Sequence, residues 1–238
     1  MDIPLFNLET SKSLQNNYVD KILELMSNNE WVLGSEVTKF EKSFSNFIGT
    51  NYCLGVNSGT DALEIGLKAL GVKPNDEVIV PGFSFFATSE VVLKIGAKPV
   101  YCDINKNDLT IDISCLEELV TASTKAIIPV HLFGNAADMH SINDLKQNNN
   151  FFVIEDVAQA FGSSINGENL GSFGDVGCFS FYPTKNLGGF GDGGAITINN
   201  TSLYEKILLL RNHGQMKKYF HETVGYNSRL DSLQASIL

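Results

Sequence analysis

Short apolar runs alternate along most of the chain with segments in which apolar residues recur at helical spacing. The apolar runs predict strands at 52–56, 77–80, 99–102, 125–130, 151–155, 177–181 and 195–198. The amphipathic segments predict helices at 61–70, 88–95, 114–121, 138–147 and 203–211, with Asp138 as the N-cap of the fourth. Residues 1–50 favour helices, interrupted by a turn at 31–34.

Several of the predicted strands are apolar at consecutive positions, which suits strands buried on both faces. Val78-Ile-Val80 and Phe151-Phe-Val-Ile154 are examples. Such strands are typical of parallel sheets covered by helices on both sides. We therefore predict an α/β fold in which residues 1–238 form one large domain, a three-layer α/β/α sandwich with a mainly parallel central sheet. In such sheets, ligands bind at the carboxyl ends of the strands.

Composition narrows the class of protein without naming it. The chain has 238 residues, of which 43% are hydrophobic, enough for one large core. Its net charge of −10 and the absence of a basic run with interleaved aromatic residues argue against nucleic-acid binding. Neither a leader-like N-terminus nor an apolar run of membrane-spanning length is present, so we expect a cytoplasmic protein without a membrane partner. The four cysteines and four histidines match no metal-binding spacing, so no metal is predicted.

An aspartate and a lysine follow two of the predicted strands. Asp156 comes directly after 151–155, and Lys185 lies 29 positions further on, in a turn after 177–181. An ionised Asp can keep a pyridine nitrogen protonated, and a Lys can join an aldehyde as a Schiff base and then act as a general base. Each residue alone is more often a cap or a solvated surface group. The combination predicts a site for pyridoxal 5′-phosphate (PLP).

Small polar residues connect the first strand to the helix that follows it. Ser58, Gly59 and Thr60 would offer backbone N–H groups and hydroxyls at a helix start, which is a common phosphate site. The alternative is an ordinary Ser or Thr N-cap. The hydroxyl of Ser180, five residues before Lys185, could reach the same phosphate.

Two further residues could contact a flat cofactor ring. Phe85 is chosen over Phe83 and Phe86 for stacking on the ring, although core packing is the commoner role of a Phe. Gln159, three residues after Asp156, lies on the same face if the segment is helical, and could donate to a phenolic oxygen. The alternative for Gln159 is a simple surface amide.

The remaining candidates concern the substrate and the cofactor phosphate. His131 follows a predicted strand and either lines the pocket or is a satisfied core histidine. Asn227 and Arg229 form a polar pair that either meets an anionic ligand or begins a helix with a salt bridge. We assign His131, Tyr182 and Arg229 to substrate binding and Asn227 to the cofactor.

Taken together, these segments resemble one family. The matching segments are 57–63, 76–81, 129–134, 155–160, 179–188 and 225–231, in family order over nearly the whole chain. They are similar to the PLP-dependent sugar-nucleotide aminotransferases of the DegT/DnrJ/StrS-like family, fold type I. The resemblance implies that Lys185 carries the cofactor and moves the proton, that Asp156 pairs with the pyridine nitrogen, and that Gln159 touches the phenolic oxygen.

The resemblance also implies partners and a reaction. Gly59, Thr60 and Ser180 would hold the phosphate, Phe85 would stack on the ring, and Asn227 would reach the PLP of a neighbouring subunit in a homodimer. The reaction would move an amino group from L-glutamate to a nucleotide-linked keto-deoxysugar. The sequence Asn-Ser-Arg-Leu-Asp at 227–231 resembles members that act on 3-keto sugars, and we expect such a sugar linked to dTDP or UDP.

Length is the main departure from the family pattern. Complete members are longer, with a C-terminal small domain after the helix that begins near Leu230, and we expect this chain to lack that domain. This keeps a second hypothesis open, a non-catalytic PLP-binding regulator or an inactive truncated paralogue. A deoxysugar dehydratase is disfavoured because that branch replaces the lysine with histidine, whereas Lys185 is present.

Overall fold

A seven-stranded sheet forms the centre of the computed structural model, which describes the chain from residue 12 to residue 238. The sheet order is β1-β9-β8-β5-β4-β2-β3. The strands are β1 (Tyr52–Val56), β2 (Glu77–Pro81), β3 (Lys98–Cys102), β4 (Thr124–Ile127), β5 (Phe152–Asp156), β8 (Val176–Ser180) and β9 (Gly194–Ile198). Strands β8, β5, β4, β2 and β3 are parallel, and β9 runs antiparallel to both of its neighbours. The prediction of a mainly parallel sheet is confirmed.

All seven predicted strands are present, and β4 is the one whose extent differs most. We predicted 125–130, but the strand ends at Ile127. Pro129 has no N–H to donate to a ladder, and Val130 forms only an isolated bridge with Asp156. The chain therefore leaves the sheet early and enters a short 3₁₀ turn, η1 (Leu132–Gly134).

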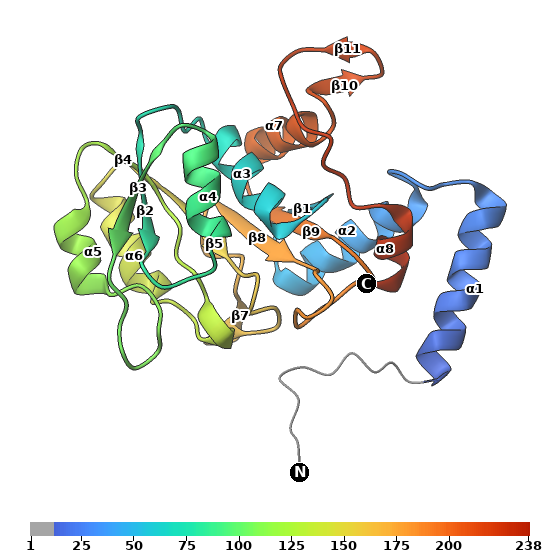
Figure 1. The fold of residues 1–238 in the computed structure, drawn as a ribbon, viewed down its shortest axis with the longest axis horizontal. Coiled ribbons are helices and arrows are strands. Elements are labelled where there is room, and N and C mark those ends of the chain that lie inside the picture. The colour runs from blue at the N-terminus through green and yellow to red at the C-terminus, as the bar shows by residue number, and fades with distance from the viewer. Residues whose placement is uncertain (1–11) are drawn as a thin grey trace.

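Helices cover both faces of the sheet and complete the predicted three layers (Figure 1). Helices α3 (Gly59–Ala69), α4 (Ala87–Lys94) and α7 (Thr201–Arg211) enclose one apolar core with the sheet. Helices α2 (Ser35–Ile48), α5 (Ile113–Leu119) and α6 (Met139–Gln147) enclose the cores on the opposite face. Asp138 caps α6 as predicted, accepting from the Ser141 N–H at 3.1 Å.

The ends of the described chain meet on one side of the molecule. Helix α1 (Lys12–Asn28) packs against the last helix, α8 (Ser232–Ile237), and the turn at 31–34 separates α1 from α2. The predicted helical character of residues 1–50 is thus confirmed from residue 12 onward, whereas residues 1–11 lie outside the described part. None of the helices between residues 12 and 238 is both long enough and apolar enough to cross a membrane.

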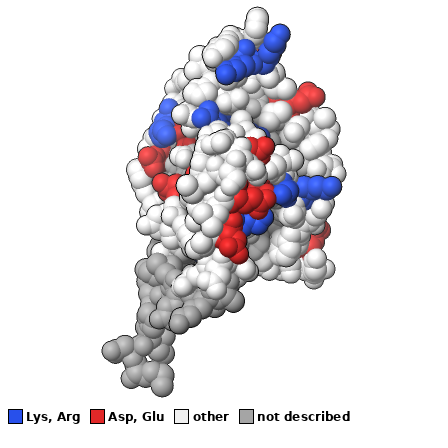
Figure 2. Space-filling model, turned by 90° about the vertical axis from the view of Figure 1, so that its right-hand side faces the viewer, with Lys and Arg blue, Asp and Glu red and all other residues white. Residues whose placement is uncertain are grey.

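Two small hairpins add to the predicted elements. The first joins β6 (Ser164–Ile165) to β7 (Glu168–Asn169) through Asn166-Gly167, both at positive φ (52° and 88°), as in a tight Asn-Gly hairpin turn. The second joins β10 (Gln215–Lys217) to β11 (Phe220–His221) and projects away from the sheet beyond α7 (Figure 1). On the face seen in Figure 2, basic side chains gather at the top, where this second hairpin lies, above a region of mixed charge.

The antiparallel strand β9 brings the two ends of one loop together. Gly194, the first residue of β9, pairs with Ser180 at the end of β8 and with Val56 at the end of β1. The loop from 181 to 193, which contains Lys185, therefore leaves the sheet and returns to it at neighbouring positions.

Candidate active site

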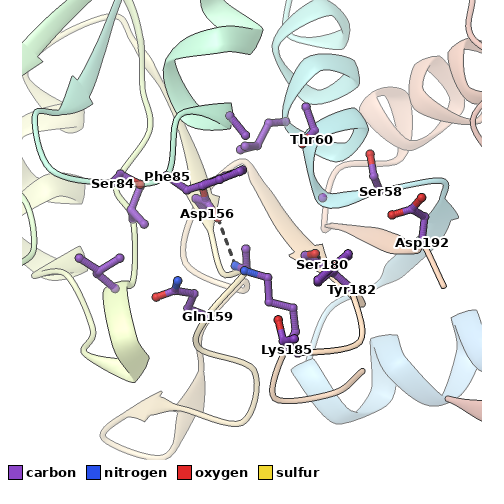
Figure 3. Close-up of a pocket in the computed structure, with 17 residues that line it drawn as sticks. Ser58, Thr60, Ser84, Phe85, Asp156, Gln159, Ser180, Tyr182, Lys185 and Asp192 are labelled. Atoms are coloured by element: carbon purple, nitrogen blue, oxygen red, sulfur yellow. Dashed lines mark hydrogen bonds between the residues drawn. The ribbon is translucent and has the colours of Figure 1, made fainter. Parts of the chain in front are cut away.

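A cavity of about 380 Å³ opens at the carboxyl ends of the parallel strands (Figure 3). It brings together nine of the twelve residues that the sequence analysis selected. These nine are Ser58, Gly59, Thr60, Phe85, Asp156, Gln159, Ser180, Tyr182 and Lys185. They come from four separate segments of the chain, so their convergence on one cavity is a property of the fold and not of local sequence.

Asp156 ends β5 and is 6% exposed at the floor of the cavity. Its carboxylate accepts a hydrogen bond from the Thr88 hydroxyl at 3.0 Å and one from the Ala158 N–H at 3.1 Å. Burial raises the pKa of Asp156, while these two hydrogen bonds and the positive charge of Lys185 act in the opposite direction. A buried carboxylate of this kind is stabilised when a cation binds beside it.

Lys185 is half-buried in the loop that follows β8. Its backbone N–H donates to the Tyr182 carbonyl at 2.8 Å, which closes a tight turn. A Cβ at Gly188 would lie 2.5 Å from the Pro183 carbonyl oxygen, so only glycine allows this loop to fold back so closely. Figure 3 shows the Lys185 side chain extending into the cavity on the side where Asp156 lies.

The opposite end of the cavity is formed by the start of α3. The Ser58 side chain caps this helix by accepting the Asp61 N–H at 3.0 Å. The N–H groups of Gly59 and Thr60 are first-turn groups, which have no partner inside a helix. Ser180 packs directly against this turn, because a Cβ on Gly59 would lie 2.8 Å from the Ser180 Cβ. Backbone donors and hydroxyls thus line one end of the cavity, which suits a phosphate group.

Phe85 and Gln159 also line the cavity. Phe85 is 74% exposed and lines the cavity, whereas Phe83 and Phe86 do not line it; that Phe85 stacks on a cofactor ring stays a prediction. The side-chain oxygen of Gln159, Oε1, accepts the Phe133 N–H at 3.0 Å. This bond fixes the orientation of the side chain and leaves its NH₂ group as a donor.

His131 does not line the cavity, and the structure favours the alternative of a core histidine. The residue is 0% exposed, and its Nδ1 accepts the Ala137 N–H at 3.1 Å. Its Nε2 therefore carries the proton and donates to the buried Glu155 carboxylate at 3.2 Å. Glu155 in turn accepts the N–H groups of Gly171, Phe173 and Gly174. Both ring nitrogens are thus occupied, and a substrate has no access to them.

Asn227 and Arg229 also lie outside the cavity. Asn227 is exposed, and Arg229 donates through Nη1 to the Asn212 side chain at 3.2 Å. Neither residue is placed against the cavity of its own chain. The structure does not bring Arg229 to the cavity where it was expected to bind the substrate, and the expectation that Asn227 reaches the PLP of a neighbouring subunit stays a prediction.

Four polar residues near the cavity were not selected from the sequence. Ser84, Thr184 and Asp192 line it, and Thr88 donates to Asp156 from the first turn of α4. Asp192 belongs to the glycine-rich segment 188–194, whose composition indicates tight turns and no particular ligand. Thr88 begins a predicted helix, and nothing in its local sequence indicates a contact with a residue 68 positions away.

Comparison with known proteins identifies the family. Residues 12–238 match the model of the DegT/DnrJ/EryC1/StrS aminotransferase family, and the chain belongs to this family.

Relatives and solved structures agree with this assignment. The chain is 45% identical over 237 residues to a protein of Acidithiobacillus ferrooxidans named UDP-N-acetyl-3-dehydro-alpha-D-glucosamine 3-aminotransferase, covering 99% of this chain and 64% of that protein. It is similar to S. venezuelae DesV, solved with a ketimine intermediate, with a TM-score of 0.95 and 40% identity; the match covers 99% of this chain and 64% of DesV. It is also similar to Bacillus subtilis NtdA, solved with pyridoxamine phosphate, with a TM-score of 0.94 and 36% identity; the match covers 99% of this chain and 55% of NtdA. The chain thus spans less than two thirds of the length of these proteins.

Proposed function

We propose that the protein is a PLP-dependent aminotransferase that moves an amino group from L-glutamate to a nucleotide-linked keto-deoxysugar. The observation that carries the proposal is the shared cavity of Asp156 and Lys185, with a phosphate-type site at its other end. A carboxylate, an amine and an anion site in one cavity match the three ends of PLP: the ring nitrogen, the aldehyde and the phosphate.

The cavity fits this cofactor on its own features. The carboxylate of Asp156 is buried, its hydrogen bonds come from the neutral donors Thr88 and Ala158, and burial raises its pKa, so a positive charge beside it would be stabilising. A protonated pyridine nitrogen would supply that charge. At the other end, the start of α3 offers backbone donors and the Ser58 and Thr60 hydroxyls for a dianion.

The residues of the chain then have distinct roles. PLP supplies an electron sink that stabilises the negative charge left when an amino acid loses its Cα proton. Asp156 holds the proton on the ring nitrogen, and the Lys185 amine removes the Cα proton of the amino donor. Phe85 packs on the ring face, and the free NH₂ of Gln159 donates to the phenolic oxygen. Tyr182, which is 52% exposed at the cavity wall, contacts the sugar.

The substrate class is proposed from two sources. The A. ferrooxidans relative is named for action at position 3 of a UDP-linked sugar. The Asn227-Ser-Arg-Leu-Asp231 segment also resembles members that act on 3-keto sugars. We infer a 3-keto sugar linked to UDP or dTDP.

We further propose a cytoplasmic homodimer in which Asn227 reaches the neighbouring subunit's site. Its exposure, and the fact that it does not line the cavity of its own chain, are compatible with this role. We also propose that residues 12–238 form the large domain of this aminotransferase.

One experiment tests the cofactor and the lysine together. The 238-residue protein is incubated with PLP, reduced with borohydride and digested, and mass spectrometry locates the modified residue. We expect modification at Lys185 and none in Lys185→Ala, with Lys146→Ala as a control, because Lys146 pairs with Asp175 away from the cavity. Label at other lysines, with Lys185 untouched, would disprove the site.

A second experiment tests the reaction. The protein is given L-glutamate and a panel of UDP-, dTDP- and GDP-linked ketosugars, and 2-oxoglutarate is measured. Production of 2-oxoglutarate in the presence of a 3-keto sugar nucleotide supports the proposal. A protein that binds PLP at Lys185 but transfers nothing to any member of the panel would favour the alternative, a non-catalytic PLP-binding protein.

A further inference from the structure

Ser228 bonds to two residues that lie 171 and 167 positions earlier in the chain, and its side chain is buried away from water. It belongs to the segment 225–231, which we call the strap. Its side chain is 0% exposed. The Ser228 hydroxyl accepts the Asn57 N–H at 3.1 Å and donates to the Asp61 carboxylate at 2.6 Å. Both of its partners border the turn 58–60, which forms the phosphate end of the cavity.

The strap itself is fixed by the end of α7. The Tyr226 N–H donates to the Leu210 carbonyl at 2.7 Å, and the Ser228 N–H donates to the Arg211 carbonyl at 2.9 Å. The Ser228 backbone is thus held from one side while its hydroxyl holds the start of α3 from the other. This arrangement gives the hydroxyl a defined position, so its two hydrogen bonds fix the positions of Asn57 and Asp61.

Asp61 explains why this position matters. It lies in the first turn of α3, one residue after Thr60, where a carboxylate stabilises the positive end of the helix. A carboxylate directed into the cavity would repel a phosphate dianion. Asp61 does not line the cavity, and its carboxylate is bonded to Ser228 instead.

From these contacts we propose that Ser228 is a positioning residue for the phosphate end of the site. It sets the backbone donors of the turn 58–60 and keeps the Asp61 carboxylate directed away from the cavity. The inference rests on the proposed function, because it assumes that a phosphate-bearing cofactor binds there. It predicts that Ser228 contributes to binding of the ligand's phosphate group and not to binding of its ring.

The test compares two ligands that differ only in the phosphate. Dissociation constants of PLP and of pyridoxal are measured by absorbance titration for the wild-type chain and for Ser228→Ala. Loss of both hydrogen bonds should weaken PLP binding about tenfold and leave pyridoxal binding within about twofold. Protection of the cofactor-free protein against thermal unfolding by inorganic phosphate should fall in parallel, which is a readout independent of Lys185.

A matched control comes from the same part of the chain. Ser232 is also 0% exposed, and its hydroxyl has no hydrogen-bond partner in the described part of the chain. Ser232→Ala also removes one buried hydroxyl, and it should leave the ratio of the PLP and pyridoxal dissociation constants unchanged. If Ser228→Ala does not fold, Ser228→Cys places a larger but weaker donor and acceptor at the same position and should shift the ratio in the same direction.

The outcomes separate this inference from the proposed function. Wild-type protein that binds no PLP overturns the proposed function, and the inference with it. If wild-type protein binds PLP and the foldable Ser228 variant keeps the wild-type ratio, the inference alone is wrong. An equal loss of PLP and pyridoxal binding would indicate a general structural role and would also overturn it.

Discussion

Thr88 and Asp156 are 68 positions apart in the sequence, yet the Thr88 hydroxyl donates a 3.0 Å hydrogen bond to the Asp156 carboxylate. Both side chains are buried, with exposed fractions of 1% and 6%. The bond opposes the effect of burial, which raises the pKa of Asp156. Thr88 therefore helps to keep ionised the carboxylate on which cofactor binding is proposed to depend.

Replacing Thr88 by Val should weaken PLP binding. Val has nearly the same shape but no hydroxyl, so the pKa of Asp156 should rise further and its ionised form should become less populated. Because the lost hydrogen bond is made to a charged group, we expect PLP affinity to fall about tenfold, as measured by absorbance titration. Thr88→Ser keeps the hydroxyl and should restore most of the affinity; equal losses in both variants would rule out this role.

Asp156→Asn should have opposite effects on stability and on cofactor binding. Because burial raises the folded-state pKa of Asp156 above its ordinary value of 3.8, its contribution to stability is fully present below that value and is lost as pH rises through the raised pKa. The thermal stability of cofactor-free Asp156→Asn relative to wild type should therefore increase with pH across this window. PLP affinity should fall by roughly 100-fold or more, because the ring nitrogen loses its charged partner.

Thermal melts from about pH 4 to pH 7, compared between the two proteins, check the stability part of this prediction. A difference between the two proteins that stays constant with pH would show that Asp156 does not titrate differently in the folded state.

His131→Ala should reduce stability without a specific effect on the substrate. The change leaves the buried Glu155 carboxylate and the Ala137 N–H without one of their partners. We expect a loss of about 2–4 kcal/mol in the free energy of unfolding, measured with denaturant. At a temperature where the variant remains folded, KM for the sugar nucleotide should stay near the wild-type value, whereas a large increase in KM would restore His131 as a substrate ligand.

Gly59→Ala should disturb the phosphate end of the cavity. The new Cβ would lie 2.8 Å from the Ser180 Cβ, which is closer than real side-chain contacts allow. Displacing either segment should cost about 1–3 kcal/mol and weaken PLP binding more than pyridoxal binding. Gly82→Ala is a suitable control, because its Cβ would meet only the Cys102 carbonyl oxygen, at 3.4 Å.

The sequence predicted those features that depend on local pattern. The apolar runs of β2 and β5 are buried on both faces, so their composition alone indicates a covered parallel sheet. Asp156 and Lys185 were found because each follows such a strand, and strand ends of a parallel sheet converge. The Asn166-Gly167 turn is a further local signal, because an Asn-Gly pair is typical of a tight hairpin.

Features that depend on tertiary contacts could not be predicted in this way. Nothing near Thr88 or Ser228 in the sequence indicates their partners, because the contacts form only when distant segments pack together. His131 was ambiguous for a related reason. A histidine after a strand can face the cavity or the core, and only the position of Glu155 decides between them.

The pairing of Ser180 with Gly194 has a consequence for how this enzyme family can diversify. Both ends of the loop 181–193 are fixed by this one pair in the sheet. Substitutions at exposed positions of the loop such as Phe190, or added residues, therefore need not displace the strands. Variation at such exposed positions would leave Asp156, which is carried by β5 in the sheet, in place.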